Sequence, residues 1–398
     1  MTLPFPVVVM LLAAMTALGP LATDMYLPAM PAMAEALQAT PAQVQLTLSI
    51  YLVGFAATQL VCGPLSDRYG RRPVLLGGFG LFLLASALCT VAPTIEVLLV
   101  GRFLQALGGA VGPVLGRAMV RDLYRPEDAG RILSQMASVM ALAPAVAPLV
   151  GGVLLMALGW ASIFAVLTGY ALLMVLLIAF FWPEPLPLDR RQSIRPGVIL
   201  GNFRMLLGQR AFLGYTLTNA AAFSGLFAFL SGSSFVLIEF LGVSPPQYGV
   251  LFAVIVFGFL CGTLVSGRLS HLGSARLIPL GVGLCLLGGG SMVVLALAGV
   301  YHVLAVIPSH AVFLAGVGIV MPQTMAGAIA PFPQCAGSAS SLFGFIQMTT
   351  AALMGAAVGQ FHDGTSRTMA VIIALAAVGA WISYLGLVRN RSRGSARA

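Results

Sequence analysis

The chain has 398 residues, of which 59% are hydrophobic and only 8% charged, and its formal net charge is +9. Soluble domains carry about 25% charged residues, so this composition excludes an ordinary soluble protein. Every cation is an arginine. Without lysine the chain cannot form the Gly-x-x-x-x-Gly-Lys loop that binds ATP phosphates, and ATP is not expected as an energy source.

Apolar runs of transmembrane length recur along the whole chain, and each predicts a helix. Closed β-barrels, the other structure that satisfies its backbone in lipid, need alternating strands of about ten residues, which this sequence lacks. We therefore predict an all-α membrane protein whose spans cover residues 5–27, 45–65, 73–92, 97–119, 131–156, 159–181, 211–238, 247–267, 276–298, 302–326, 336–360 and 367–388.

The stretch 183–210 divides this series into two sets of six spans. Pro183, Pro185 and Pro187 prevent a continuous helix there, and charged residues follow them. A layout of six plus six spans is typical of two pseudo-symmetric bundles around a site at the membrane midplane. The predicted domains are a bundle at 1–182, a cytoplasmic linker at 183–210, a bundle at 211–388 and a cytoplasmic tail at 389–398.

The arginines predict the orientation of the chain in the membrane. Apart from Arg102, within a span, and Arg367, in an opposite loop, all of them lie in or beside loops on one side and in the C-terminal tail. Positively charged loops stay in the cytoplasm. We therefore expect a multi-pass protein of the bacterial inner membrane with both termini cytoplasmic. Because the basic charge follows this topology, no nucleic-acid partner is expected.

The densest charge lies between spans two and three, in the sequence GPLSDRYGRRP at 63–73. Its candidate gating residues are Gly63, Asp67, Arg68, Gly70, Arg71 and Arg72. A weaker copy, GRLSHLG at 267–273, stands between spans eight and nine with His271 in the place of Asp67, which supports duplicated halves. A tight, positively charged turn without a gating role is the alternative interpretation.

Asp24, Arg102 and Glu239 are ionisable residues that lie within or at the ends of spans. A charge at the bilayer centre costs about 2.5–3.5 kcal/mol on insertion scales, so Asp24 in span one and Arg102 in span four are candidates for function. Both lie at a similar depth and could face one cavity. Asp24 could instead be an interfacial residue at a helix end, and Arg102 could extend to the lipid headgroups. Glu239, at the end of span seven, is either a second acid at the cavity mouth or a solvated helix end.

Span five contains APAVAPLVGG at 143–152. Pro144 and Pro148 would bend the helix, and Gly151 and Gly152 would let another backbone approach closely. Methionine and aromatic side chains suit a pocket for varied apolar ligands. The residues predicted to line such a pocket are Met25, Tyr26, Phe55, Met140, Phe227 and Phe235, with Glu239.

The sequence gives no sign of an enzyme or a metal site. Its five cysteines lie in or near apolar spans without CxxC spacing. We find no nucleophile and no cluster of metal ligands, so neither a metal nor another cofactor is expected.

These motifs resemble a known family. The loop at 63–73 is similar to the signature loop of major facilitator transporters, RFLQALGG at 102–109 to their span-four motif, and the span-five stretch to the motif of drug antiporters. More narrowly, GPLATDMYLPAMP at 19–31, QLTLSIYLVGFAATQL at 45–60, MVRDLY at 119–124 and AGSASSL at 336–342 resemble the bicyclomycin and chloramphenicol resistance exporters.

The resemblance implies a proton-coupled antiporter that exports small amphipathic compounds or drugs, with Asp24 as the protonatable acid and Arg102 as its partner. Asp67 and the arginines around it would form an inner latch, and the Asp67 carboxylate could sit at the N-terminus of span eleven near Gly337. The proton gradient would replace any cofactor, and a monomer is expected. Two alternatives stay open: an exporter of an endogenous metabolite such as an amino acid or siderophore, and a polytopic membrane enzyme.

Overall fold

The structure is a computed structural model that describes residues 5–124, 126–191 and 196–389. Within these ranges it is helical with short connections, has no strand, and contains twelve helices long and apolar enough to cross a membrane. The predicted all-α, twelve-span fold is confirmed. Five of the arginines used to predict the orientation lie outside the described residues: Arg125, Arg195, Arg391, Arg393 and Arg397.

The first half of the chain forms six spans. The first span is built from three pieces, α1, the short turn η1 and α2, and the fourth is divided between α5 and α6. The elements are α1 (Phe5–Asp24), η1 (Leu27–Ala29), α2 (Met30–Ala36), α3 (Pro41–Tyr69), α4 (Arg71–Thr90), α5 (Ile95–Gly109), α6 (Val111–Leu123), α7 (Pro126–Leu158) and α8 (Ala161–Phe181).

The linker contains η2 (Leu188–Arg190) and α9 (Pro196–Leu207), and six further spans follow it. They are built from α10 (Arg210–Ser234), η3 (Phe235–Phe240), α11 (Pro245–Arg268), η4 (Ser270–Leu272), α12 (Ser274–Leu297), α13 (Val303–Ile329), η5 (Pro333–Cys335), α14 (Ala336–Gln360), α15 (Arg367–Ser383) and η6 (Tyr384–Arg389).

The second span of each half begins with the same local device. Thr40 precedes Pro41 at the start of α3, and Ser244 precedes Pro245 at the start of α11. In both cases the third helical residue is a glutamine that completes a capping box, which satisfies backbone N–H groups at the helix start. The shared Ser/Thr-Pro-x-Gln pattern is a second sign of the duplication.

The charged segment 63–72 is almost entirely helical rather than a loop. Helix α3 continues to Tyr69 and α4 begins at Arg71, so only Gly70 separates them. Gly70 has φ +102°, and Gly273, at the matching turn before α12, has φ +76°. Both angles lie in the left-handed region that favours glycine. The weak sequence copy at 267–273 therefore corresponds to the same turn in the second half.

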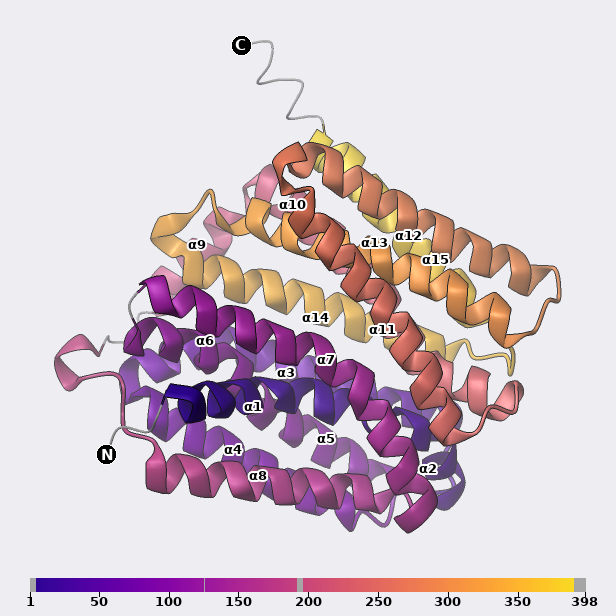
Figure 1. Cartoon of the computed structure of the whole chain (residues 1–398), viewed down its shortest axis with the longest axis horizontal. Coiled ribbons are helices and arrows are strands. Elements are labelled where there is room, and N and C mark those ends of the chain that lie inside the picture. Colours follow the sequence, from indigo (N-terminus) through magenta and orange to yellow (C-terminus); the bar gives the residue numbers. More distant parts are fainter. Residues whose placement is uncertain (1–4, 125, 192–195, 390–398) are drawn as a thin grey trace.

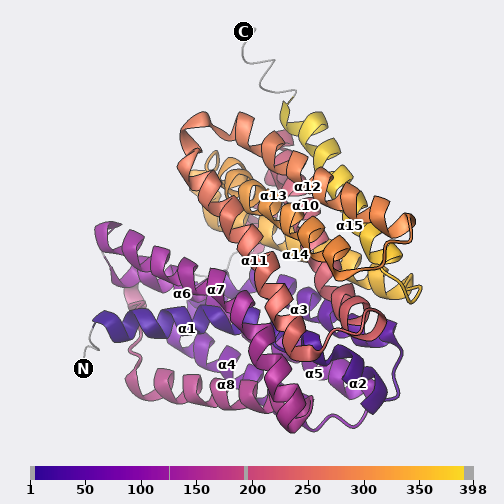
Figure 2. The same cartoon turned by 45° about the vertical axis from the view of Figure 1, so that its right-hand side comes forward.

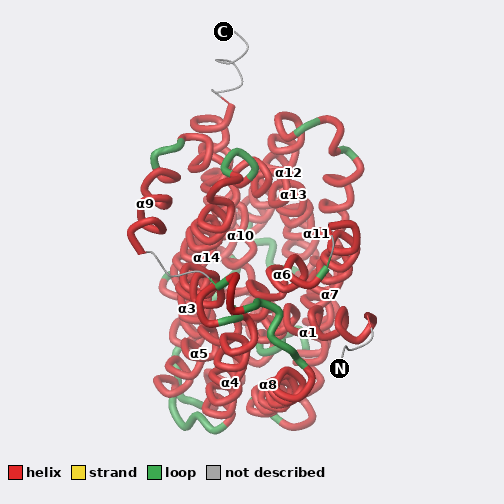
Figure 3. The backbone as a smooth tube through the Cα atoms, turned by 90° about the vertical axis from the view of Figure 1, so that its left-hand side faces the viewer, coloured by secondary structure: helices red, strands yellow, loops and turns green. Residues whose placement is uncertain are grey.

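The two halves form two bodies that converge at one end of the molecule (Figure 1 and Figure 2). We call this the far end; it contains η1, α2 and η3. The opposite end, which contains the turns at Gly70 and Gly273 and the linker helix α9, is called the hairpin end and faces the viewer in Figure 3. At the far end, η1 contacts α10 and α11, and α2 contacts η3. The most extensive contacts between the halves are those of α3 with α14 and of α7 with α11.

Candidate functional site

Asp24 lies at a break inside the first span. It is the last residue of α1, and Pro28 in η1 and Pro31 in α2 lack the N–H groups that a continuous helix needs. Because α2 continues the span to Ala36, Asp24 lies well inside it and is only 4% exposed. The structure therefore disfavours the alternative of an interfacial residue at a helix end.

Arg102, on α5, is completely buried. Its Nη1 donates to the backbone oxygen of Ala22 at 2.9 Å and to Gln105 Oε1 at 2.6 Å. The guanidinium lies over the rings of Tyr26 and Tyr51, 4.3 Å and 4.4 Å from their centroids, which is cation–π geometry. A side chain held in this way does not extend to the lipid headgroups.

The structure brings Arg102 and Asp24 to the same segment of α1 without pairing them. Arg102 contacts Ala22, two residues before Asp24, and Tyr26, two residues after it. In the part of the chain that the structure describes, the ion pairs lie instead at the turn between α3 and α4. Arg102 therefore holds the backbone of Ala22 before the acid and the ring of Tyr26 after it, and it leaves the Asp24 carboxylate without a fixed positive partner.

The turn at Gly70 is a network within the first half. Arg71 forms ion pairs with Asp67 and, at 2.9 Å, with Asp122 at the end of α6, and its Nη1 also donates to Ser66 Oγ at 2.6 Å. Arg72 donates to the backbone oxygen of Ala179 at 2.7 Å. These contacts connect the turn to the fourth and sixth spans.

Glu184, in the linker, is part of this network and was not among the sequence candidates. Its two carboxylate oxygens accept the backbone N–H groups of Arg71 and Arg72, at 2.9 Å and 3.0 Å, and so cap the N-terminus of α4. A Cβ at Gly70 would meet the Glu184 carboxylate. The available signal was a single acid among the linker prolines, which alone does not indicate a partner.

The glycines of the span-five motif are positions of close backbone approach, as the small residues suggested. A Cβ on Gly151 would collide with the backbone oxygen of Met25, next to Asp24. A Cβ on Gly152 would lie 2.6 Å from the backbone oxygen of Pro245, at the start of α11 in the other half. Pro144 and Pro148 lie inside α7, which continues from Pro126 to Leu158.

The predicted pocket residues differ in their surroundings. Met25, Tyr26, Phe227 and Phe235 are buried, whereas Phe55 and Met140 are half-buried. Glu239 is exposed in η3 at the far end.

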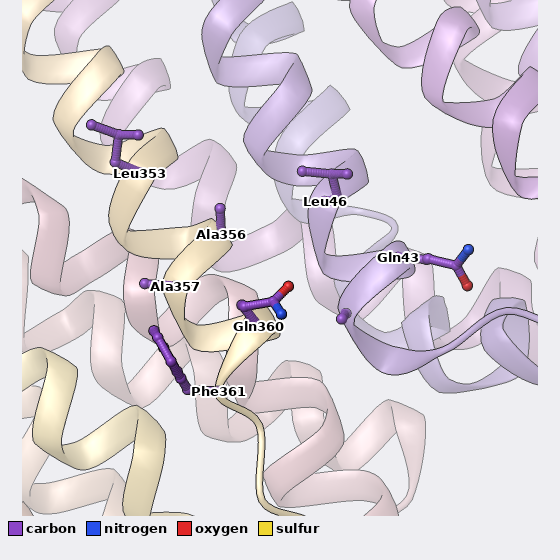
Figure 4. Close-up of a pocket in the computed structure, with 8 residues that line it drawn as sticks. Gln43, Leu46, Leu353, Ala356, Ala357, Gln360 and Phe361 are labelled. Atoms are coloured by element: carbon purple, nitrogen blue, oxygen red, sulfur yellow. The ribbon is translucent and has the colours of Figure 1, made fainter.

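None of the pocket candidates lines the groove in Figure 4, which lies between the start of α3 and the end of α14 and is formed by Ala42, Gln43, Leu46, Leu353, Ala356, Ala357, Gln360 and Phe361.

The second half contributes a buried amide group that sequence reasoning missed. Asn219 on α10 donates to Thr324 Oγ1 on α13 at 2.8 Å and accepts from Gln347 Nε2 on α14 at 2.7 Å. A polar side chain inside an apolar span was the available signal, since polar groups within the membrane need partners.

The structure has two six-span halves that converge at one end. A buried acid, Asp24, lies at the break in the first span, and Arg102 contacts residues on either side of it. This arrangement defines a polytopic membrane transporter. The chain belongs to the Major Facilitator Superfamily, whose family model matches residues 12–356.

Relatives and a solved structure agree with this assignment. The chain is 30% identical to the bicyclomycin resistance protein homolog of Haemophilus influenzae, over 97% of this chain and 98% of that protein. It is 36% identical to the chloramphenicol resistance protein of Pseudomonas aeruginosa, over 84% of this chain and 79% of that protein. The crystal structure of a bacterial homolog to the human lysosomal transporter Spinster has the same fold, with a TM-score of 0.76, 15% identity, and coverage of 96% and 98% of the two chains.

Proposed function

We propose that this protein is a proton-coupled antiporter of the bacterial inner membrane that exports small amphipathic drugs by alternating access. The observation that carries the proposal is Asp24, a carboxyl group that is 4% exposed at the helix break inside the first span. The names of the relatives, which refer to bicyclomycin and chloramphenicol resistance, indicate the substrate class.

The orientation of the chain defines the two sides between which proton and substrate would be exchanged. The arginines of the hairpin end, such as Arg68, Arg71 and Arg72, support a cytoplasmic location for that end under the positive-inside rule. The halves contact each other at the far end, so this conformation is closed toward the periplasm. Protons would bind Asp24 from the periplasm in the opposite conformation and leave toward the cytoplasm in this one.

Asp24 can exchange a proton because it has no fixed positive partner here. An ionised carboxylate in an apolar span is costly, so its protonation state depends on which conformation admits water. Arg102 holds Ala22 and Tyr26 in place around it, and Gly151 packs on Met25. Substrate and proton would then compete for one segment, which couples their opposite movements.

The test is transport into proteoliposomes driven by a pH gradient, with chloramphenicol as substrate. Asp24→Asn should reduce the initial rate at least about tenfold, which corresponds to about 1.4 kcal/mol. Glu239→Gln is the matched control, because that acid is exposed at the far end, and it should keep the wild-type rate.

Proton-driven transport by Asp24→Asn at the wild-type rate would refute the coupling. Loss of transport in Glu239→Gln would instead mean that Glu239 takes part in proton coupling. If the wild-type protein moves an amino acid rather than drugs, the chain is a metabolite exporter on the same fold.

A further inference from the structure

His310, on α13 in the second half, is a buried ionisable side chain that the proposed function does not use. It is 0% exposed, and its ring stacks on Phe229 of α10, with centroids 3.9 Å apart, and on Phe313, with centroids 5.4 Å apart. Neither Nδ1 nor Nε2 has a hydrogen-bond partner. Buried polar groups are bonded in the large majority of cases, so this ring needs an explanation.

The duplication gives His310 a counterpart in the first half, which is Arg102. Each stands eight residues after the residue that caps its helix, Thr94 for α5 and His302 for α13. Each is also covered by an aromatic ring from the first span of its own half, Tyr26 for Arg102 and Phe229 for His310.

A glycine six residues further along each helix confirms the alignment. A Cβ on Gly108 would meet the backbone oxygen of Gly78 and the backbone nitrogen of Phe82. A Cβ on Gly316 would meet the backbone oxygen of Gly281 and the backbone nitrogen of Cys285. Since both glycines pack on the preceding span in the same way, Arg102 and His310 occupy equivalent places in the two bundles.

The two places differ in their hydrogen-bond acceptors. Arg102 donates to Gln105, three residues along its helix, and to the backbone of Ala22. The residue three positions after His310 is Phe313, which offers a ring face instead of an oxygen. Aromatic faces attract a cation, but the two N–H groups of a protonated histidine would lack acceptors in this conformation.

We propose that His310 is a second proton-binding site and that a proton bound there favours the conformation open at the far end. The present conformation, which is closed at the far end, leaves both ring nitrogens of His310 without partners and so disfavours the charged ring. A conformation that lets water or a polar group reach them binds the proton more tightly and gains population on acidification. The inference extends the proposed proton coupling and rests on it for its role in transport.

Other ionisable groups around His310 do not account for a response near neutral pH. Tyr248 of α11 shares a hydrogen bond with Ser233 of α10, and Cys285 of α12 donates to the backbone oxygen of Phe313. Free phenols and thiols titrate above about pH 8. The described arginines of the helices packed around α13 stand at or near their hairpin ends: Arg210, Arg268 and Arg276. Asp24, in the other half, is the remaining acid within the bundle.

The test measures conformation rather than transport. A cysteine-free protein carries spin labels at Leu123→Cys on α6 and Gln334→Cys in η5, both exposed and one in each half of the hairpin end. The distance distribution is recorded between about pH 8 and about pH 5.5, the range in which histidine titrates. Every sample carries Asp24→Asn, so that Asp24 does not contribute.

The conformation open at the far end has a closed hairpin end, where the labels lie. Acidification should raise the population of this conformation at least about threefold in the Asp24→Asn protein. His310→Gln should abolish this response, and His302→Gln, at an exposed helix cap, should retain it. His310→Gln keeps a polar side chain, and its melting temperature shows whether it folds.

A response that is absent in Asp24→Asn, or unchanged by His310→Gln, overturns the inference. If the response depends on His310 but no proton-driven export occurs, the proton site stands and the proposed function fails.

Discussion

Arg102 shows how a charge can be kept inside this bundle without an acidic partner. Two tyrosine rings lie against its guanidinium, at 4.3 Å and 4.4 Å, and one Nη1 donates to two oxygens. Gln105 is in turn fixed, because its Nε2 donates to Ser86 at 2.8 Å. The planar shape of the guanidinium therefore contributes to its binding in the bundle as much as its charge does.

Arg102→Lys should lower stability and transport although it keeps the charge. A lysine ammonium cannot stack flat between two rings, and two cation–π contacts of about 1 kcal/mol each would be weakened. We expect a loss of about 1–2 kcal/mol in the free energy of unfolding and a slower pH-driven rate, measured by thermal melting and in proteoliposomes.

Arg367→Lys is the control for this substitution. Arg367 is exposed at the far end and lies over the single ring of Tyr301 at 5.6 Å. It should behave like the wild type. Equal effects of the two substitutions would mean that the enclosed stacking at Arg102 contributes nothing specific.

At the scale of elements, helix α7 connects the candidate acid to the closure of the far end. Gly151 faces Met25 in its own half, and Gly152 faces Pro245 in the other. From the opposite side, a Cβ on Gly249 of α11 would lie 2.7 Å from the Leu149 Cα. Adjacent residues of one helix thus contact both the break at Asp24 and the partner half.

Gly152→Ala should shift the protein toward the conformation open at the far end. The added methyl group would stand 2.6 Å from the backbone oxygen of Pro245, which cannot move aside as a flexible side chain can. Spin-label distances between the far ends of α7 and α11 should lengthen, and Gly249→Ala should act in the same direction.

Gly130→Ala is the matched control on the same helix, because nothing lies within 4 Å of a Cβ there. It should leave the distances unchanged and gain up to about 1 kcal/mol of helix stability. Distances in Gly152→Ala that match those of Gly130→Ala would rule out a role for this contact in closure.

At the scale of the molecule, α3 and α14 form an antiparallel pair across the two halves. A Cβ on Gly359 would meet Gln45, one on Gly355 would meet Ser49, and one on Gly344 would meet Gln59. This register, continued by about two turns, places Asp67 opposite the start of α14. In the present conformation Asp67 pairs with Arg71 and its side chain is 42% exposed. Closure of the hairpin end would offer it the helix N-terminus near Gly337.

A disulfide cross-link tests this latch. With the five native cysteines replaced, Asp67→Cys and Gly337→Cys should cross-link slowly in the wild-type background and at least about threefold faster with Gly152→Ala, which favours a closed hairpin end.

Without cysteines at these positions, Asp67→Ala should slow turnover and keep substrate binding. The latch would be refuted if Gly152→Ala does not change the cross-linking rate and Asp67→Ala turns over normally. The turn at Gly70 would then have a structural role without gating.

Local properties of the chain were enough to predict much of this fold. Hydropathy located all twelve candidate spans, because each must match the thickness of a bilayer. Small residues marked the close approach at Gly152. The extension of the first span through α2 was missed, since Pro28, Pro31 and Glu35 in this stretch resemble a loop.

The membrane class, the two halves and the residues able to carry charge within them can be predicted from the amino-acid sequence alone. These follow from composition and spacing, which act locally. The contact partners of these side chains, in contrast, follow from the packing of the helices. This packing placed Arg102 between Tyr26 and Tyr51, joined Glu184 to the turn at Gly70, and left the nitrogens of His310 without hydrogen bonds. Partners depend on which helices pack together, and residues far apart in the chain meet only after both halves have folded.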